Sequence, residues 1–136
     1  MSRISPSMIA SRLPWFVIGL FILLQALGFV MDNLNYSKGS QLPSPDGKKT
    51  IHEFRSNQDG VGHAPYGTTL SLSFGKTLAQ PDDGYVFFAG YCKTPVSYAW
   101  LSNDKVVVSC ELAEGEKAPR TLARLTYGIE IGFDAK

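Results

Sequence analysis

The sequence is poor in cysteine, histidine and net charge. Its 136 residues include two cysteines and two histidines, and the formal net charge is +1. Two cysteines are too few for a disulfide-dense miniprotein or a four-cysteine zinc site. The near-zero charge excludes the composition of a basic nucleic-acid binder, and 44% hydrophobic residues exclude that of a disordered acidic chain. The chain is long enough for one domain, and thirteen glycines with eight prolines indicate many turns.

Charge is also absent from one long segment near the N-terminus. Residues 13–31 contain no charged side chain, and Gln25 is the only strongly polar one. A helix of this length, rising ~1.5 Å per residue, spans ~30 Å, the thickness of a bilayer's hydrocarbon core. We therefore predict a transmembrane helix over residues 13–31 that is retained as an anchor. Cleavage as a signal peptide after Ala26-Leu27-Gly28 is the alternative.

The charges that flank this segment predict its orientation. Arg3 and Arg12 precede it without any acidic residue, and Asp32 follows it directly. The positive-inside rule then places residues 1–12 in the cytoplasm and residues 32–136 outside it. We expect a single-pass protein whose C-terminal part is extracytoplasmic, in a periplasm or on the open cell surface.

The rest of the chain has the composition of a linker and then of β-strands. Residues 32–45 are polar and rich in turn formers, which predicts a linker. Over residues 46–136 apolar and polar side chains alternate with a period of two, as in half-buried strands. The predicted fold class is mainly β: one N-terminal transmembrane helix, then a small antiparallel β-sandwich or barrel-like sheet of about six strands. The predicted strands cover residues 49–55, 70–74, 85–89, 96–101, 105–112 and 125–133.

Two short motifs carry a resemblance. Residues 44–49, SPDGKK, resemble the opening of a TolB-like β-propeller blade, and residues 100–108, WLSNDKVVV, resemble the later hairpin of such a blade. A propeller needs several blades of about 40 residues, and this chain has room for about two. The chain is therefore more similar to small uncharacterised bacterial membrane-anchored or lipoprotein-like β-domain proteins, over residues 43–110. The resemblance implies a location at the bacterial inner membrane and no particular activity.

The two cysteines are predicted to form a disulfide, because an exported domain meets an oxidising compartment. A two-residue turn at Asn103-Asp104 would place Cys110 opposite Ser97, five residues from Cys92. A straight hairpin would then hold the sulfur atoms about 17 Å apart. The bridge therefore requires the chain to turn at residues 93–95, so that Cys92 ends a separate strand. Two buried free thiols are the alternative.

No segment has the spacing of a catalytic, metal or cofactor site. His52 and His63 stand eleven residues apart and lack the spacings of zinc ligands. The glycine-rich loop over residues 58–69 lacks the lysine of a phosphate-binding loop, and Asp82-Asp83 is typical of a hairpin turn. We expect no metal, no cofactor and no enzymatic activity.

Partner contact is expected on one of two surfaces. The first is the glycine-rich loop, because loops on a rigid sheet often carry binding residues. The second is an aromatic-rich group on the strands at residues 85–91 and 96–101, for which core packing is the alternative. Two strands of so small a domain cannot both bury each side, so some of these rings, the tyrosines first, are expected to form an exposed patch. The loop is favoured slightly. The candidate contact residues are His63 and Tyr66 in the loop, and Tyr85, Tyr91 and Tyr98 on the strands.

These features predict a membrane-anchored extracytoplasmic protein-binding module, of the kind found among immunity proteins and inhibitors. The alternative is a structural or assembly factor of the envelope that uses its transmembrane helix to form a complex. The expected partners are the membrane and another protein, and nucleic acid is not expected.

Overall fold

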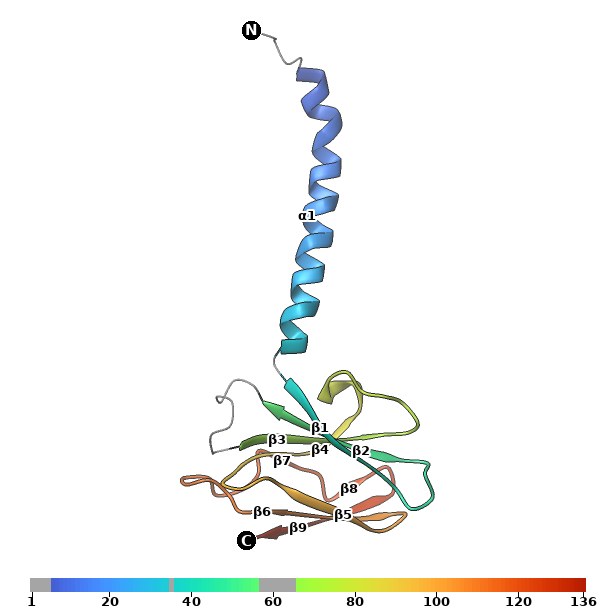
Figure 1. Ribbon diagram of the computed structural model, residues 1–136, viewed down its shortest axis with the longest axis vertical. Coiled ribbons are helices and arrows are strands. Elements are labelled where there is room, and N and C mark those ends of the chain that lie inside the picture. Colours follow the sequence, from blue (N-terminus) through green and yellow to red (C-terminus); the bar gives the residue numbers. More distant parts are fainter. Residues whose placement is uncertain (1–5, 35, 57–65) are drawn as a thin grey trace. The chain divides into compact units, whose positions relative to one another are not determined.

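The chain folds as a helical unit and a β unit in the computed structural model, which describes residues 6–34, 36–56 and 66–136. The first unit, Met1–Leu34, contains the helix α1 (Pro6–Leu34), and the second unit, Asn35–Lys136, contains all the strands (Figure 1). Pro14 lies inside α1 rather than in its first turn, so one backbone hydrogen bond of the helix is missing there.

The prediction of a transmembrane helix over residues 13–31 is wrong. Within the part of the chain that the structure describes, no helix is both long and apolar enough to cross a membrane. The helix that forms is longer than the uncharged segment and takes in Arg12 and Asp32.

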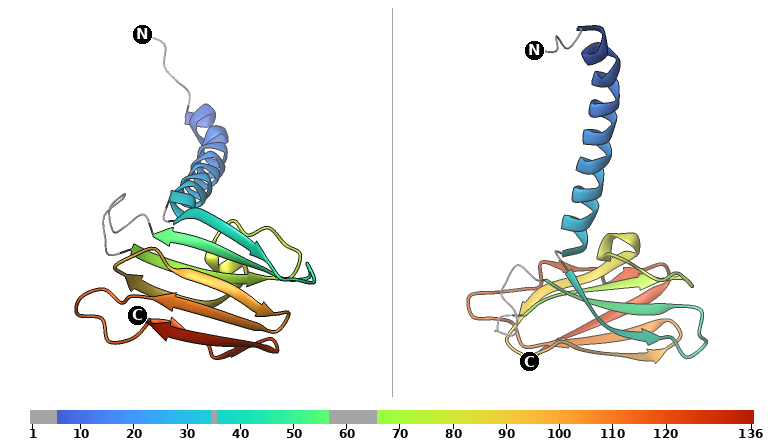
Figure 2. Two further views of the ribbon diagram at one scale, coloured as in Figure 1. Left: turned by 60° about the horizontal axis from the view of Figure 1, so that its bottom comes forward. Right: turned by 45° about the horizontal axis from the view of Figure 1, so that its top comes forward.

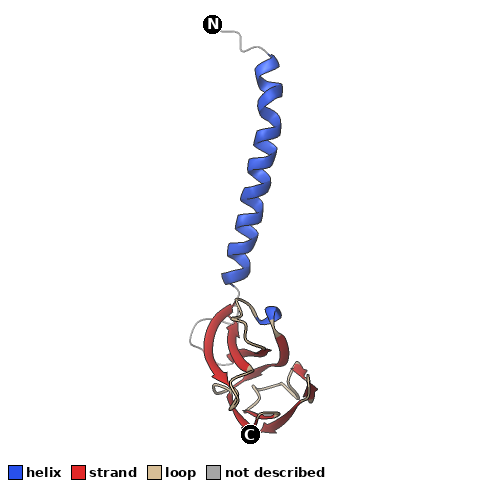
Figure 3. Ribbon diagram, turned by 90° about the vertical axis from the view of Figure 1, so that its right-hand side faces the viewer, coloured by secondary structure: helices blue, strands red, loops and turns tan. Residues whose placement is uncertain are grey.

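The β unit is built from two sheets, which lie as two layers in Figures 2 and 3. One sheet has the strand order β1-β2-β3-β4-β7, and the other has the order β5-β6-β9-β8. All pairings are antiparallel except that of β6 with β9, which is parallel. The strands are β1 (Tyr36–Pro43), β2 (Thr50–Ser56), β3 (Tyr66–Ser73), β4 (Tyr85–Cys92), β5 (Ser97–Ser102), β6 (Lys105–Cys110), β7 (Thr121–Leu122), β8 (Leu125–Thr126) and β9 (Ile129–Ala135).

The mainly β class is confirmed, but the purely antiparallel sandwich or barrel-like sheet of about six strands is not, because β6 and β9 pair in parallel. The described residues form nine strands in two sheets. Residues 32–45, predicted as a linker, contain β1, an edge strand whose side chains are mostly exposed and therefore show no alternation. The strand predicted over residues 125–133 is divided into β8 and β9 by a turn at Tyr127-Gly128.

The core lies between the two sheets. Period-two alternation places Leu70 and Leu72 of β3 on the inner face of one sheet, and Val106 and Val108 of β6 on that of the other. All four side chains are buried, and burying a side chain of this size stabilises a fold by about 1.5–3 kcal/mol. The remaining large members of the core are Ile51, Phe87, Phe88, Ile129 and Ile131.

A disulfide joins the two sheets at one end of this core. Cys92, the last residue of β4, bonds to Cys110, the last residue of β6, with their Cα atoms 5.7 Å apart. The predicted pairing is confirmed, and so is the required break in the chain, since β5 begins only at Ser97 and in the other sheet. The predicted register is wrong by one residue: Ser97 pairs with Ser109, because the ladder shifts between Trp100 and Ser102.

Replacing both cysteines with alanine should lower the free energy of unfolding by about 3 kcal/mol. The bridge closes a loop with a sequence separation of 18 residues, and opening it restores conformational freedom to the unfolded chain. Urea denaturation of the full-length protein measures this loss, and reduction of the wild-type protein should reproduce it. Free alkylation of both thiols in native, non-reduced protein would contradict the prediction.

Candidate binding surface

The two residues predicted from the glycine-rich loop cannot be placed in a surface. His63 lies outside the described residues. Tyr66 is the first residue of β3, but its side chain is not among those that the structure describes. The loop prediction therefore stays a prediction. The three strand tyrosines are described, and each has a different environment.

Tyr91 is half-buried and is covered by a cation. The guanidinium carbon of Arg120 lies 4.3 Å from the centre of the Tyr91 ring, a cation–π contact. This contact occupies one face of the ring. Tyr91 is therefore a weaker candidate for partner contact than a ring with a free face.

Tyr98 lies in a seam between β1 and β5, the edge strands of the two sheets. Its hydroxyl donates a hydrogen bond to Glu53 Oε2 at 3.2 Å and lies 3.2 Å from Ser40 Oγ. Trp100, two residues further along β5, donates its indole N–H to the Leu42 carbonyl at 3.1 Å. Side-chain hydrogen bonds therefore join β1 and β5, which do not share a ladder of backbone hydrogen bonds. These side chains also supply partners for the exposed backbone edge of β1.

Glu53 is the ionisable centre of this seam. It is 5% exposed and accepts hydrogen bonds from Ser40 Oγ at 2.8 Å and from Arg55 Nε at 2.9 Å. Burial raises the pKa of the carboxyl, but the hydrogen bonds from Ser40 and Arg55, with the Arg55 charge, outweigh it and lower the pKa. A Cβ atom at Gly39 would stand 2.8 Å from the carboxyl carbon, so only glycine leaves room for this side chain.

Replacing Tyr98 with phenylalanine should lower the free energy of unfolding by about 1–2 kcal/mol, the contribution of a hydrogen bond to a partly buried charge. Urea denaturation measures the loss. The matched control is Tyr36→Phe at an exposed tyrosine of β1, which should change stability by less than about 0.5 kcal/mol. Equal losses in the two variants would contradict a structural role for the Tyr98 hydroxyl.

The third tyrosine, Tyr85, belongs to an exposed cluster of aromatic rings with Phe74 and Tyr127. The ring centres of Tyr85 and Tyr127 are 4.0 Å apart, and Phe74 lies 5.9 Å from Tyr85 and 5.8 Å from Tyr127, edge to face with both. The exposed fractions of Phe74, Tyr85 and Tyr127 are 43%, 42% and 62%. We call these three residues the ring cluster.

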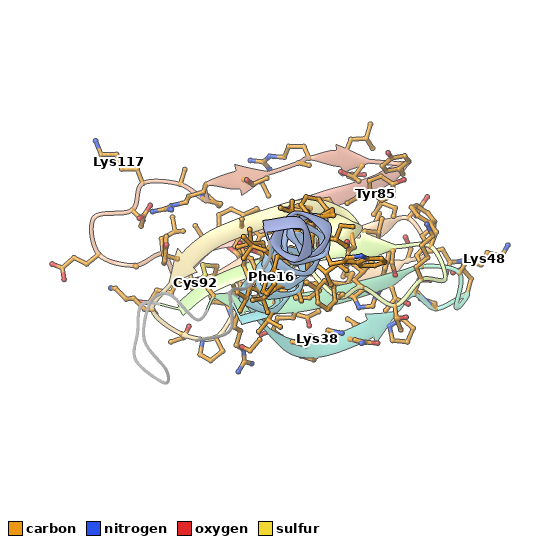
Figure 4. All side chains as sticks on the ribbon, turned by 90° about the horizontal axis from the view of Figure 1, so that it is seen from above. Phe16, Lys38, Lys48, Tyr85, Cys92 and Lys117 are labelled. Carbon is orange, nitrogen blue, oxygen red and sulfur yellow. A yellow bond between two sulfur atoms is a disulfide. The ribbon has the colours of Figure 1, made fainter. Side chains whose placement is uncertain are left out.

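The ring cluster connects the two sheets at the end opposite the disulfide. Tyr85 is the first residue of β4 and Cys92 the last, and Figure 4 labels them at opposite ends of the β unit. Phe74 directly follows β3 in the same sheet, whereas Tyr127 lies between β8 and β9 of the other sheet. The cluster therefore sits over the open end of the sandwich.

Tyr127 occupies a conformation that a large side chain rarely adopts. Thr126 pairs with Ile129, and both residues of the intervening turn have positive φ, 49° at Tyr127 and 77° at Gly128. This is a type I′ hairpin turn, whose first position favours asparagine, aspartate or glycine. A bulky residue with positive φ is strained, and such strain gathers at functional sites.

A hydrogen bond joins two hydroxyl groups of the cluster. A hydrogen bond with Tyr85 raises the pKa of Tyr127, because the bond is lost when the proton leaves. The Tyr127 hydroxyl therefore remains protonated near neutral pH, and the cluster presents aromatic rings with polar tips. Tyrosines of this kind are enriched at protein interfaces.

Tyr127 was missed by the sequence prediction. The alternation of Leu125, Tyr127, Ile129 and Ile131 predicted one continuous strand, in which Tyr127 would face the core. The signal that could have found it is Gly128, because a glycine inside a strand pattern indicates a bulge or a turn.

A buried histidine lies beneath this end of the sandwich. His52 of β2 holds its Nε2 atom 2.8 Å from Ser73 Oγ, and its ring also bonds the backbone of Lys76. Burial lowers the pKa of His52, and the charge of Lys38 lowers it further, against the hydrogen bond to Lys76, which raises it. The neutral ring therefore ties the segment that follows β3 to the sheet.

The free energy of unfolding should fall between about pH 7.5 and about pH 5.5. The unfolded state takes up the His52 proton near its ordinary pKa of ~6.5, whereas the folded state takes it up only at a lower pH. The stabilisation is thus complete above ~6.5 and is lost as the pH falls through the lowered pKa. Urea denaturation at both pH values should show a smaller fall for His52→Gln than for the wild type. The control variant His63→Gln should retain the decrease in the free energy of unfolding that His52 causes. If His52→Gln showed the same decrease as the wild type, the assignment of this pH dependence to His52 would be contradicted.

Comparison with known proteins identifies no relative. No protein-family description, curated protein or solved structure matches the chain. The resemblance to SPDGK-containing bacterial β-domain proteins therefore stays a prediction. In the described part of the chain, no three histidine, cysteine, aspartate or glutamate side chains gather as metal ligands.

Proposed function

We propose that the β unit is an extracytoplasmic protein-binding module and that the ring cluster is its contact surface. One observation carries the proposal: three aromatic rings stand together on the surface, and one of them is held there by a strained backbone. Aromatic side chains contribute a large share of the binding energy at protein interfaces. The Cys92–Cys110 bridge supports an oxidising, extracytoplasmic location.

The exposure of the rings favours binding over folding as their role. A ring that stays about half exposed buries only part of its apolar area in the core, so its contribution to stability is limited. The strain at Tyr127 reduces that contribution further. The limited contribution of the rings to stability and the strain at Tyr127 are both offset if a partner covers the rings, because apolar area is then removed from water on binding.

The proposal includes inhibitors and immunity proteins, which act by occupying a surface of another protein. The alternative function, an assembly factor that uses a transmembrane helix, depended on that helix and is not carried forward.

Replacing Tyr127 with asparagine should raise the thermal stability and weaken binding in the same variant. Asparagine tolerates a positive φ in a type I′ turn, so the strain is relieved, while the ring is removed from the surface. Thermal unfolding measures the first effect, and the dissociation constant for the partner, expected to rise at least about tenfold, measures the second. A variant that is more stable and binds as tightly as the wild type would contradict the proposal.

The partner itself can be found by photocrosslinking. A photoreactive phenylalanine at position 127, in the cells that make the protein, should give one discrete adduct that mass spectrometry identifies. The matched control position is Leu101, which is 68% exposed and lies on β5, at the opposite edge of the same sheet. Equal crosslinking from both positions would show that the ring cluster is not a specific contact.

A further inference from the structure

A pocket opens beside the ring cluster, between it and the segment that joins β3 to β4. Its volume is about 230 Å³, and the rings of Phe74 and Tyr85 line it together with the buried side chains of Leu72 and Leu78. Pockets for drug-sized ligands measure about 300–1,000 Å³, so this one has room for a single large side chain.

Three charged residues also line the pocket: Lys76, Asp82 and Asp83. Asp83 Oδ2 accepts hydrogen bonds from the backbone N–H groups of Ala79 and Gln80, at 3.1 Å and 3.0 Å, which hold its carboxylate in place. Within the described residues no ion pair joins Asp82 or Lys76 to another side chain. The charges of the lining therefore sum to −1, with the Asp82 carboxylate exposed to solvent.

The pocket thus combines two features that attract a cation. Carboxylates provide a negative charge at short range, and the faces of aromatic rings attract cations through their π electrons. An acidic side chain would be attracted only by the charge of Lys76 and would be repelled by the two carboxylates. Charge complementarity therefore favours a basic side chain as the occupant.

Resting on the proposed function, we propose that this pocket receives one arginine side chain of the protein partner. The planar guanidinium group can stack on an aromatic ring while its N–H groups donate to a carboxylate, which the compact ammonium group of lysine cannot do in the same way. The aliphatic part of the arginine would contact Leu72 and Leu78. The pocket would then select the partner, and the ring cluster would supply the area of contact.

The probe is N-acetyl-arginine amide, titrated into the full-length, isotope-labelled protein and followed by NMR. We expect saturable shifts at the amides of Phe74, Lys76 and Tyr85, with a dissociation constant in the millimolar range. N-acetyl-citrulline amide has nearly the same shape without the charge, and it should bind at least about threefold more weakly. N-acetyl-lysine amide should also bind more weakly than the arginine probe.

The variant Asp82→Asn should weaken arginine binding by about threefold, the effect of losing one exposed ion pair. The matched control is Asp134→Asn, the same change on β9 beside Ser109, at the disulfide end of the domain, and it should leave the titration unchanged. Circular dichroism of both variants confirms that they are folded.

Three results would overturn the arginine assignment: no saturable shift at these residues, equal binding of the citrulline probe, or equal binding by the Asp82→Asn variant. Saturation of the same residues by N-acetyl-aspartate amide instead would assign the pocket to an acidic side chain. The crosslink from position 127 does not involve Asp82. A positive crosslink with a failed titration therefore removes only the arginine assignment, and a failed crosslink with a positive titration removes only the proposed partner surface.

Discussion

The disulfide between Cys92 and Cys110 is the constraint around which the β unit is arranged. It joins the last residue of β4 to the last residue of β6, and these strands belong to different sheets. The chain therefore has to leave one sheet after Cys92 and enter the other at Ser97. Backbone contacts join the same two segments: the Lys93 N–H donates to the Glu111 carbonyl, and Cys92 pairs with Leu112 in an isolated antiparallel β-bridge. The covalent bond and the hydrogen bonds together close one end of the sandwich.

The seam between β1 and β5 closes one side of the sandwich by different means. Neither edge strand pairs with the other, so their polar backbone groups need other partners. Tyr98 and Trp100 supply them from β5, and the buried carboxylate of Glu53 draws Ser40, Arg55 and Tyr98 to one point. Removing one of these donors would leave the buried Glu53 carboxylate short of a hydrogen bond and lower the free energy of unfolding. The seam therefore favours this one arrangement of the edge strands as well as stabilising it.

With one end and one side closed, the remaining end carries the surface features. The start of β4, the end of β3 and the turn between β8 and β9 meet there, and the ring cluster and its adjoining pocket lie on them. At the other end, the disulfide joins the two sheets covalently. Strain at Tyr127 and the exposure of three rings are therefore compatible with a stable fold, and the proposed contact surface and the disulfide lie at opposite ends of the same strand, β4.

Much of this could be predicted from local sequence. Period-two alternation located most of the long strands, because residues two apart in a strand share a face. The cysteine pairing was predicted from an oxidising compartment, and the short reach of a disulfide then required the turn at residues 93–95. The absence of charge over residues 13–31 was a weaker guide, since it predicted a membrane crossing that the described helix does not support. Among the candidate contact residues whose side chains the structure describes, only Tyr85 belongs to the ring cluster.

The rest was decided by tertiary structure. Tyr98 and Ser40 are separated by 58 residues, and Tyr127 reaches Tyr85 from another sheet, so no local pattern records either contact. Edge strands such as β1 lack alternation because both faces are exposed. The sequence by itself determined which residues could form strands and which cysteines could pair, because these depend on neighbours along the chain. The tertiary structure alone decided which tyrosines are exposed together, because that depends on how the two sheets pack.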